Sequence, residues 1–191
     1  MAKIVVLFHS GYGHTRKQAE AVLAGANTTP GATAALMPID AEGMIAEADW
    51  TTLAEADAIV FGSPTYMGGP SWQFKKVADT SSKPWFGQAW KDKIGGGFTN
   101  SASMNGDKFN TITYFVTLAM QHGMVWIGTG MLPANSKAAN RNDLNYLAGS
   151  TGAYAQSPSD SSPDEGPLPG DLETAKHFGS RLAAYAVKTR G

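Results

Sequence analysis

The feature that most constrains the fold is a short apolar run that stops abruptly in a polar, glycine-flanked loop. Ile4–Phe8 is apolar at every position, and the loop Ser10–Thr15, with the sequence SGYGHT, follows almost at once. Strands with apolar residues at consecutive positions are typical of parallel sheets that are covered on both faces. A helical pattern of apolar residues begins directly after the loop, over Thr15–Ala26. The chain therefore opens with a strand–loop–helix unit of the kind that builds α/β folds.

Similar units alternate along the rest of the chain. Further strands are predicted at Ala32–Ile39, Ala58–Gly62, Lys93–Phe98 and Met124–Ile127, and further helices at Ser71–Ser81, Asp107–His122 and Asp171–Val187. Right-handed helical crossovers between parallel strands place helices on both faces of the sheet. The sequence therefore predicts one α/β domain over residues 1–191, with a flavodoxin-like, doubly wound, five-stranded parallel sheet. Residues 130–170 are predicted to be an irregular excursion before the last helix, because Ser157–Gly170 is rich in Pro, Ser and Asp.

Composition and charge exclude several classes of protein. The formal net charge of −1 gives no basic surface for nucleic acid or for an anionic membrane, and it lacks the strong acidity of a small electron carrier. The absence of cysteine excludes a disulfide framework, a thiolate-held cluster and a thiol nucleophile. No apolar run approaches the roughly 18 residues of a membrane span, and no signal peptide is readable. We expect a cytoplasmic protein.

Three polar, glycine-bearing loops follow the first, third and fourth predicted strands. Ligands of open parallel sheets bind outside the carboxyl ends of the strands, where the strand order reverses. Ser10–Thr15 offers backbone N–H groups and hydroxyls to a phosphate at a helix N-terminus. Pro64–Gly68 places an aromatic ring and a thioether on a turn, which suits a flat ring, and Asn100–Gly106 offers amides and hydroxyls to the polar edge of a heterocycle. Each loop alone could be an ordinary turn, so their convergence is the functional signal.

Four motifs, SGYGHT, GSPTYMG, FTNSASMNG and QHGM, occur in this order along the chain. Together they resemble the WrbA branch of the flavodoxin-like NAD(P)H:quinone oxidoreductases, and the resemblance covers nearly the whole chain. It implies FMN as the cofactor, NADH or NADPH as the electron donor, a quinone as the acceptor and ping-pong kinetics. It also implies a homo-oligomer, a dimer or a tetramer, in which neighbouring subunits complete each active site.

The resemblance implies roles for individual residues. Those expected to bind FMN are Ser10, Gly11, Tyr12, Gly13, His14, Thr15, Pro64, Thr65, Tyr66, Met67, Gly68, Asn100, Ser101, Ala102, Ser103, Met104, Asn105 and Gly106. His122 is the expected catalytic residue, and Tyr12, Trp85 and His122 are expected to contact the substrates. On the residues alone, His122 could instead cap the end of a helix before Gly123, and Trp85 could fill the core. No two histidines lie at ligand spacing with carboxylates, so we predict no metal site.

Three points stay open at the level of sequence. Tyr66-Met67 stands where the family often has Arg-Phe, which leaves the choice between NADH and NADPH undecided. The same pocket could serve a flavodoxin-type electron carrier, an NAD(P)H-dependent FMN, azo or nitro reductase, or a flavin-holding scaffold. Ala138–Gly170 is expected to fold over a neighbour's pocket and to shape substrate choice.

A phosphoacceptor receiver domain is excluded, because Phe8-His9-Ser10 offers no acidic cluster after the first strand.

Overall fold

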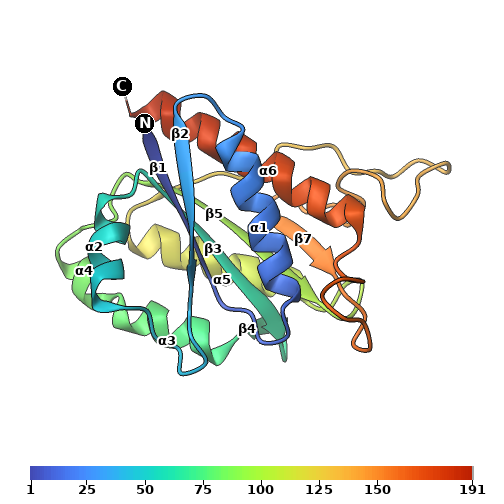
Figure 1. Ribbon diagram of the computed structural model, residues 1–191, viewed down its shortest axis with the longest axis horizontal. Coiled ribbons are helices and arrows are strands. Elements are labelled where there is room, and N and C mark those ends of the chain that lie inside the picture. Colours follow the sequence, from blue (N-terminus) through green and yellow to red (C-terminus); the bar gives the residue numbers. More distant parts are fainter. Residues whose placement is uncertain (191) are drawn as a thin grey trace.

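The computed structural model describes residues 1–190, and it shows a sheet with helices on both faces (Figure 1). The strands are β1 (Ala2–Phe8), β2 (Ala32–Pro38), β3 (Ala58–Tyr66), β4 (Gly69–Pro70), β5 (Ile94–Ser101), β6 (Val125–Trp126) and β7 (Ala153–Gln156). The helices are α1 (His14–Asn27), α2 (Glu47–Glu55), α3 (Trp72–Thr80), α4 (Ser82–Phe86), α5 (Lys108–Gln121) and α6 (Pro169–Thr189). The short helices α2 and α4 were not predicted from the sequence. No helix within residues 1–190 is long and apolar enough to cross a membrane.

The main strands run parallel in the order β2-β1-β3-β5-β6, which confirms the predicted fold class. The fifth strand position is divided between two short strands. β6 pairs with Ile94 and Gly95 at the start of β5, and β7 pairs in parallel with Phe98–Ser101 at its end. The prediction of an irregular segment over residues 130–170 is therefore wrong at Ala153–Gln156, which completes the sheet. These four residues alternate between apolar and polar, but the pattern is short and lies between a glycine-rich and a serine-rich stretch, so it was not recognised as a strand.

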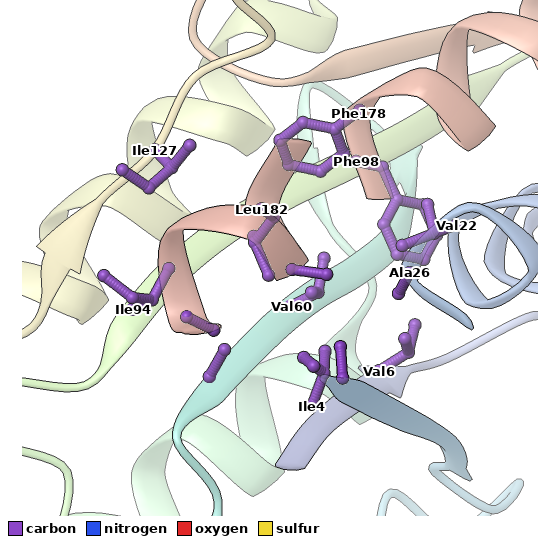
Figure 2. Packing of buried hydrophobic residues seen from close by; sticks show 14 of the residues in the cluster. Ile4, Val6, Val22, Ala26, Val60, Ile94, Phe98, Ile127, Phe178 and Leu182 are labelled. Carbon is purple, nitrogen blue, oxygen red and sulfur yellow. The ribbon is translucent and has the colours of Figure 1, made fainter. Parts of the chain in front are cut away.

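The two faces of the sheet are covered by different helices. Ile4, Val6 and Phe8 of β1 pack with α1 and α6 in one buried cluster (Figure 2). Val5 and Leu7 point to the opposite face, where buried residues of α2, α3 and α5 form a second cluster. Because successive side chains of a strand point to opposite faces, an apolar run of consecutive residues supplies both clusters.

The segment between β6 and β7, residues 127–152, docks against α6 and projects beyond it (Figure 1). Its main anchor is Arg141, which makes two hydrogen bonds to the carboxylate of Asp171 in the first turn of α6, at 2.7 and 2.6 Å. The same carboxylate accepts a hydrogen bond from the backbone N–H of Gln156, at the end of β7. One partly buried ion pair therefore connects the excursion, the last strand and the last helix.

The crossing of α1 and α6 depends on two glycines. A Cβ at Gly179 would meet the carbonyl oxygen of Val22, and a Cβ at Gly25 would meet the carbonyl oxygen of Lys176. Each glycine lets the backbone of the other helix approach closely. Neither contact can be relieved by turning a side chain, because the opposing atoms belong to the backbone.

We expect Gly179→Ala to destabilise the protein, although alanine favours a helix by about 1 kcal/mol over glycine. Overpacking against a fixed backbone costs about 1–3 kcal/mol, and here the two helices would have to move apart. His177→Ala, at an exposed position of the same helix, should change the free energy of unfolding by less than about 0.5 kcal/mol. Urea denaturation of both variants measures the difference. Equal stability of the two would contradict the tight crossing.

Candidate functional site

A pocket of about 500 Å³ lies outside the carboxyl ends of β1, β3, β5 and β7. The residues that line it are Tyr12, His14, Thr15, Pro64, Thr65, Tyr66, Asn100, Ser101, Ala102, Ser157, Pro158, Ser159 and Ser161. The first nine come from the three loops that the sequence analysis selected. The fold therefore brings these loops together at one edge of the sheet, as expected for a doubly wound protein.

The loop after β1 presents unpaired backbone donors. Within residues 1–190, none of the N–H groups from Ser10 to Thr15 donates a hydrogen bond. The hydroxyl of Ser10 accepts a hydrogen bond from the N–H of Arg16 at 3.1 Å, which leaves its own O–H able to donate to a ligand. Unpaired N–H groups at the start of a helix such as α1 bind anions, and the helix dipole adds to the attraction. This loop fits a phosphate group.

The loop after β3 is a tight hairpin rather than an irregular turn. Thr65 and Tyr66 pair with Pro70 and Gly69 of β4, and the two-residue turn Met67-Gly68 has positive φ at both positions. This turn holds Tyr66 against the first loop, where its hydroxyl lies directly over Gly11 and a Cβ at that glycine would not fit. Burial raises the pKa of Tyr66, so its hydroxyl stays protonated and can donate a hydrogen bond.

Aromatic side chains form the rim of the pocket. Tyr66 is 38% exposed and meets the more exposed ring of Tyr12 edge to face, with 6.2 Å between the ring centroids. The side chain of Met67 points fully into solvent at the tip of the hairpin. Two adjacent aromatic rings beside a row of N–H donors suit a ligand that carries both a flat ring and an anionic group.

The floor between β3 and β5 is a chain of buried hydroxyls. Thr99 Oγ1 donates to the carbonyl of Ser63 at 2.7 Å and lies 2.8 Å from Thr65 Oγ1, which in turn lies 2.8 Å from Thr111 Oγ1. Since the proton of Thr99 is already used, the proton of Thr65 is directed to Thr99 and that of Thr111 to Thr65. Thr65 therefore lines the pocket but is held by its neighbours from below.

The segment after β7 closes the pocket over the same chain. Ser157 Oγ donates to Asn100 Oδ1 at 3.0 Å, and His14 Nδ1 donates to the carbonyl of Gly166 at 2.8 Å. Pro163 lies over the first loop, where its Cγ would be 2.7 Å from a Cβ at Gly13. Ser157–Gly166 therefore covers its own chain's pocket. The expectation that this part of the excursion folds over a neighbour's pocket is corrected.

The structure does not bring His122 to this pocket. Helix α5 starts beside the loop after β5 and runs back along the sheet for 14 residues, about 20 Å, so that its end lies at the opposite edge. There His122 is only 6% exposed, stacks on Trp90 with 4.1 Å between ring centroids, and lies 2.9 Å from Ser81 Oγ. The expected catalytic role of His122 therefore does not fit its position within the chain, which is that of a buried residue at the end of a helix.

Trp85 lies at the same far edge, where its indole N–H donates to the carbonyl of Gln121 at 2.8 Å. It is exposed and packs edge to face on Phe86, with 5.3 Å between centroids. Within one chain Trp85 cannot wall the pocket. Among the expected substrate contacts, the structure places only Tyr12 there.

Burial lowers the pKa of His122 to about 4. Since Ser81 Oγ donates to the carbonyl of Ala78, it accepts a hydrogen bond from the Nε2–H of a neutral His122. The Nδ1 atom is buried without a partner, so a second proton on the ring would be unsatisfied.

We expect the protein to lose stability as the pH falls from about 6.5 to about 4. In this window the unfolded state binds a proton at His122 and the folded state does not, which lowers the free energy of unfolding by up to about 3 kcal/mol. His122→Gln should flatten this part of the profile, whereas His177→Gln at an exposed position should leave it unchanged. Thermal denaturation between pH 7 and pH 4 measures the slopes. A His122→Gln variant with an unchanged slope would contradict the assignment.

Two contributions to the site were not predicted from the sequence. Ser157, Pro158, Ser159 and Ser161 line the pocket, but their Pro- and Ser-rich composition indicated only a surface loop. Lys108, the first residue of α5, is buried behind the loop after β5. A lysine at the start of a helix gives no sequence signal that its ammonium group is buried.

A doubly wound parallel sheet with an anion-binding loop and a hydroxyl-rich pocket at its carboxyl edge defines a flavodoxin-like nucleotide-binding protein. A family model described as NADPH-dependent FMN reductase matches residues 46–139. Flavodoxin FldP of Pseudomonas aeruginosa (strain UCBPP-PA14) is 50% identical over 183 residues, which cover 96% of both chains. The crystal structure of a flavodoxin, WrbA-like protein from Agrobacterium tumefaciens is 49% identical, with a TM-score of 0.79 over 98% of this chain and 99% of that one. The chain therefore belongs to the WrbA-type, flavodoxin-like FMN family.

A flavodoxin from the domain Archaea is only 17% identical, with a TM-score of 0.62 over 96% of this chain and 98% of that one. This likeness shows the fold alone. It indicates that the arrangement of sheet and helices does not depend on the particular residues of the three loops.

Proposed function

We propose that this protein is an FMN-dependent oxidoreductase that transfers two electrons from NADH or NADPH to a quinone. The observation that carries the proposal is the row of unpaired N–H groups from Ser10 to Thr15, which opens into a pocket with an aromatic rim. FMN has a phosphate group, a hydroxylated chain and a flat ring, and the pocket offers complementary groups to each. The residues present therefore fit the cofactor that the family implies.

The residues of the chain have separate tasks in this proposal. The first loop holds the phosphate, Tyr66 and the hairpin Thr65–Pro70 flank the flat ring, and Asn100–Gly106 meets its polar edge. When bound, FMN supplies two-electron chemistry between a nicotinamide and a quinone. Tyr12 contacts the nicotinamide nucleotide in this proposal, which its 77% exposure at the rim supports. Thr99 and Thr111 hold Thr65, on the pocket floor, in place from below.

A flavodoxin-type electron carrier is the second candidate, and the name of the 50% identical Pseudomonas protein supports it. The net charge of −1 supports the oxidoreductase instead, because small carriers depend on strong charge to dock on their partners. The match to a family described as NADPH-dependent FMN reductase also supports reduction by a nicotinamide.

A homo-oligomer and a cytoplasmic location complete the proposal. Trp85 and Phe86 expose a pair of aromatic rings at the edge opposite the pocket, a surface that a second subunit would cover. Through such contacts Trp85 would reach a neighbour's pocket, in keeping with the family resemblance. Analytical ultracentrifugation of the purified protein measures the oligomeric state.

Mixing the FMN-loaded protein with NADH or NADPH in a stopped-flow instrument tests the proposed function. We expect one nucleotide to bleach the flavin absorbance fully and benzoquinone to restore it within the same experiment. Free FMN at the same concentration is the control and should react far more slowly. If the protein holds FMN but neither nucleotide bleaches it, the carrier is the better assignment. If the protein does not hold FMN, the pocket has been misassigned.

We expect the segment over the first loop to retain FMN. Replacing residues 159–165 with a short glycine linker removes Pro163 and Asp164 from above the phosphate site, and FMN should then dissociate about tenfold faster or more, a loss of about 1.4 kcal/mol. Lys17→Met is the matched control, because it removes only the exposed ion pair with Asp164, at 3.0 Å. Fluorescence of released FMN measures both rates. Equal rates in the two variants would contradict a retaining role.

A further inference from the structure

Lys108 is a buried cation whose partners are all backbone carbonyls. The residue is only 1% exposed. Its Nζ donates hydrogen bonds to the carbonyl oxygens of Ser103, Met104 and Asn105, at 2.6, 3.0 and 3.4 Å. No carboxylate within residues 1–190 forms an ion pair with it. Burial lowers the pKa of Lys108 to about 8, Asp171 of α6 acts to raise it and Arg141 of the excursion to lower it, so the ammonium is charged at neutral pH.

These three hydrogen bonds fix the orientation of three successive peptide groups. In a planar trans peptide the C=O and the following N–H point in opposite directions. Because the carbonyls of residues 103–105 point to Lys108, the N–H groups of Met104, Asn105 and Gly106 point away from it. None of these N–H groups donates a hydrogen bond within the described chain, residues 1–190.

A second contact holds the same loop. Ser101 Oγ donates to the carbonyl of Ser103 at 3.1 Å, so that carbonyl accepts two hydrogen bonds. Gly106 has a φ of +54° and would place any Cβ against Ser101 Oγ. The loop continues directly from Asn100–Ala102, which line the pocket. Its three N–H groups, which have no partner within residues 1–190, therefore follow directly on the residues that line the pocket, in a row of the kind that binds anions.

We propose that Lys108 is a positioning residue that turns the N–H groups of Met104–Gly106 outward and makes the site prefer the reduced, anionic cofactor to the oxidised, neutral ring. This inference rests on the proposed function, because it takes FMN to be the ligand. Without the ammonium, the carbonyl of Met104 would lack a donor, and those of Ser103 and Asn105 would each keep only one of two, from Ser101 Oγ and the N–H of Lys108. The loop would then turn to find other partners. The positive charge also acts directly on an anion across the loop, through a region of low dielectric constant.

Lys108→Met tests the proposal, since methionine fills similar space without charge or donors. We expect its affinity for reduced FMN, relative to oxidised FMN, to fall about tenfold, which moves the two-electron midpoint potential about 30 mV more negative. Lys93→Met is the matched control. Lys93 also donates to backbone carbonyls, those of Ala54 and Ala56, but at the opposite edge of the sheet. The Lys93→Met variant should keep the wild-type midpoint potential.

A chemical rescue separates charge from packing. Because the chain contains no cysteine, Lys108→Cys introduces a single thiol. Alkylation of this thiol with 2-bromoethylamine in denaturant, followed by refolding, restores an ammonium group on a side chain of nearly the same length as lysine. We expect the alkylated protein to regain the wild-type potential and the unmodified variant to resemble Lys108→Met. The wild-type chain treated in the same way controls for the procedure.

A third measurement does not depend on the cofactor. In the cofactor-free protein, the amide NMR signals of Met104, Asn105 and Gly106 should shift in Lys108→Met and stay in place in Lys93→Met. If the wild type fails to bind FMN, the proposed function fails, and these amide shifts still decide whether Lys108 orients the loop. An unchanged potential in Lys108→Met, equal shifts in both variants, or no recovery after alkylation would each overturn the proposal.

Discussion

The burial of the central strands on both faces is the constraint on which the rest of the structure depends. Val5 and Val6 are adjacent in β1, yet they belong to two separate buried clusters, one against α3 and α5 and the other against α1 and α6. Both clusters exist only if helices return on both sides of a parallel sheet. Such a sheet ends all its strands at one edge, and this edge is where backbone N–H groups from Ser10 to Thr15 are left without partners. The packing of the core thereby creates the polar site.

The walls of the pocket are held from behind by groups that face away from a ligand. Thr99 and Thr111 hold Thr65 through shared hydroxyl protons, and Lys108 holds the loop after β5 through its carbonyls. The segment after β7 closes the first loop through Gly166 and Pro163. A rigid backbone with outward donors is suited to a charged ligand, because the donors need not reorganise when it binds.

His122 shows that a family motif does not by itself place a residue in the pocket of its own chain. The QHGM motif lies at the end of a helix that connects two parallel strands, and such a helix must run from the carboxyl edge back to the amino edge of the sheet. The direction of α5 alone would have placed His122 away from the pocket of its own chain. What could not have been foreseen is the stacking of His122 on Trp90, which depends on the packing of α4 and the turn after it.

The sequence predicted the alternation of the main strands and helices, the three loops at the carboxyl edge and the family, because these follow from local patterns and short motifs. Nine of the residues that it selected line the pocket. Only the tertiary structure decided that Ala153–Gln156 completes the sheet, that Ser157–Gly166 covers the pocket of its own chain, and that the ammonium of Lys108 is buried beneath a loop. Each of these depends on contacts between segments distant in the sequence or on the burial of one side chain. Neither leaves a periodic pattern in the sequence.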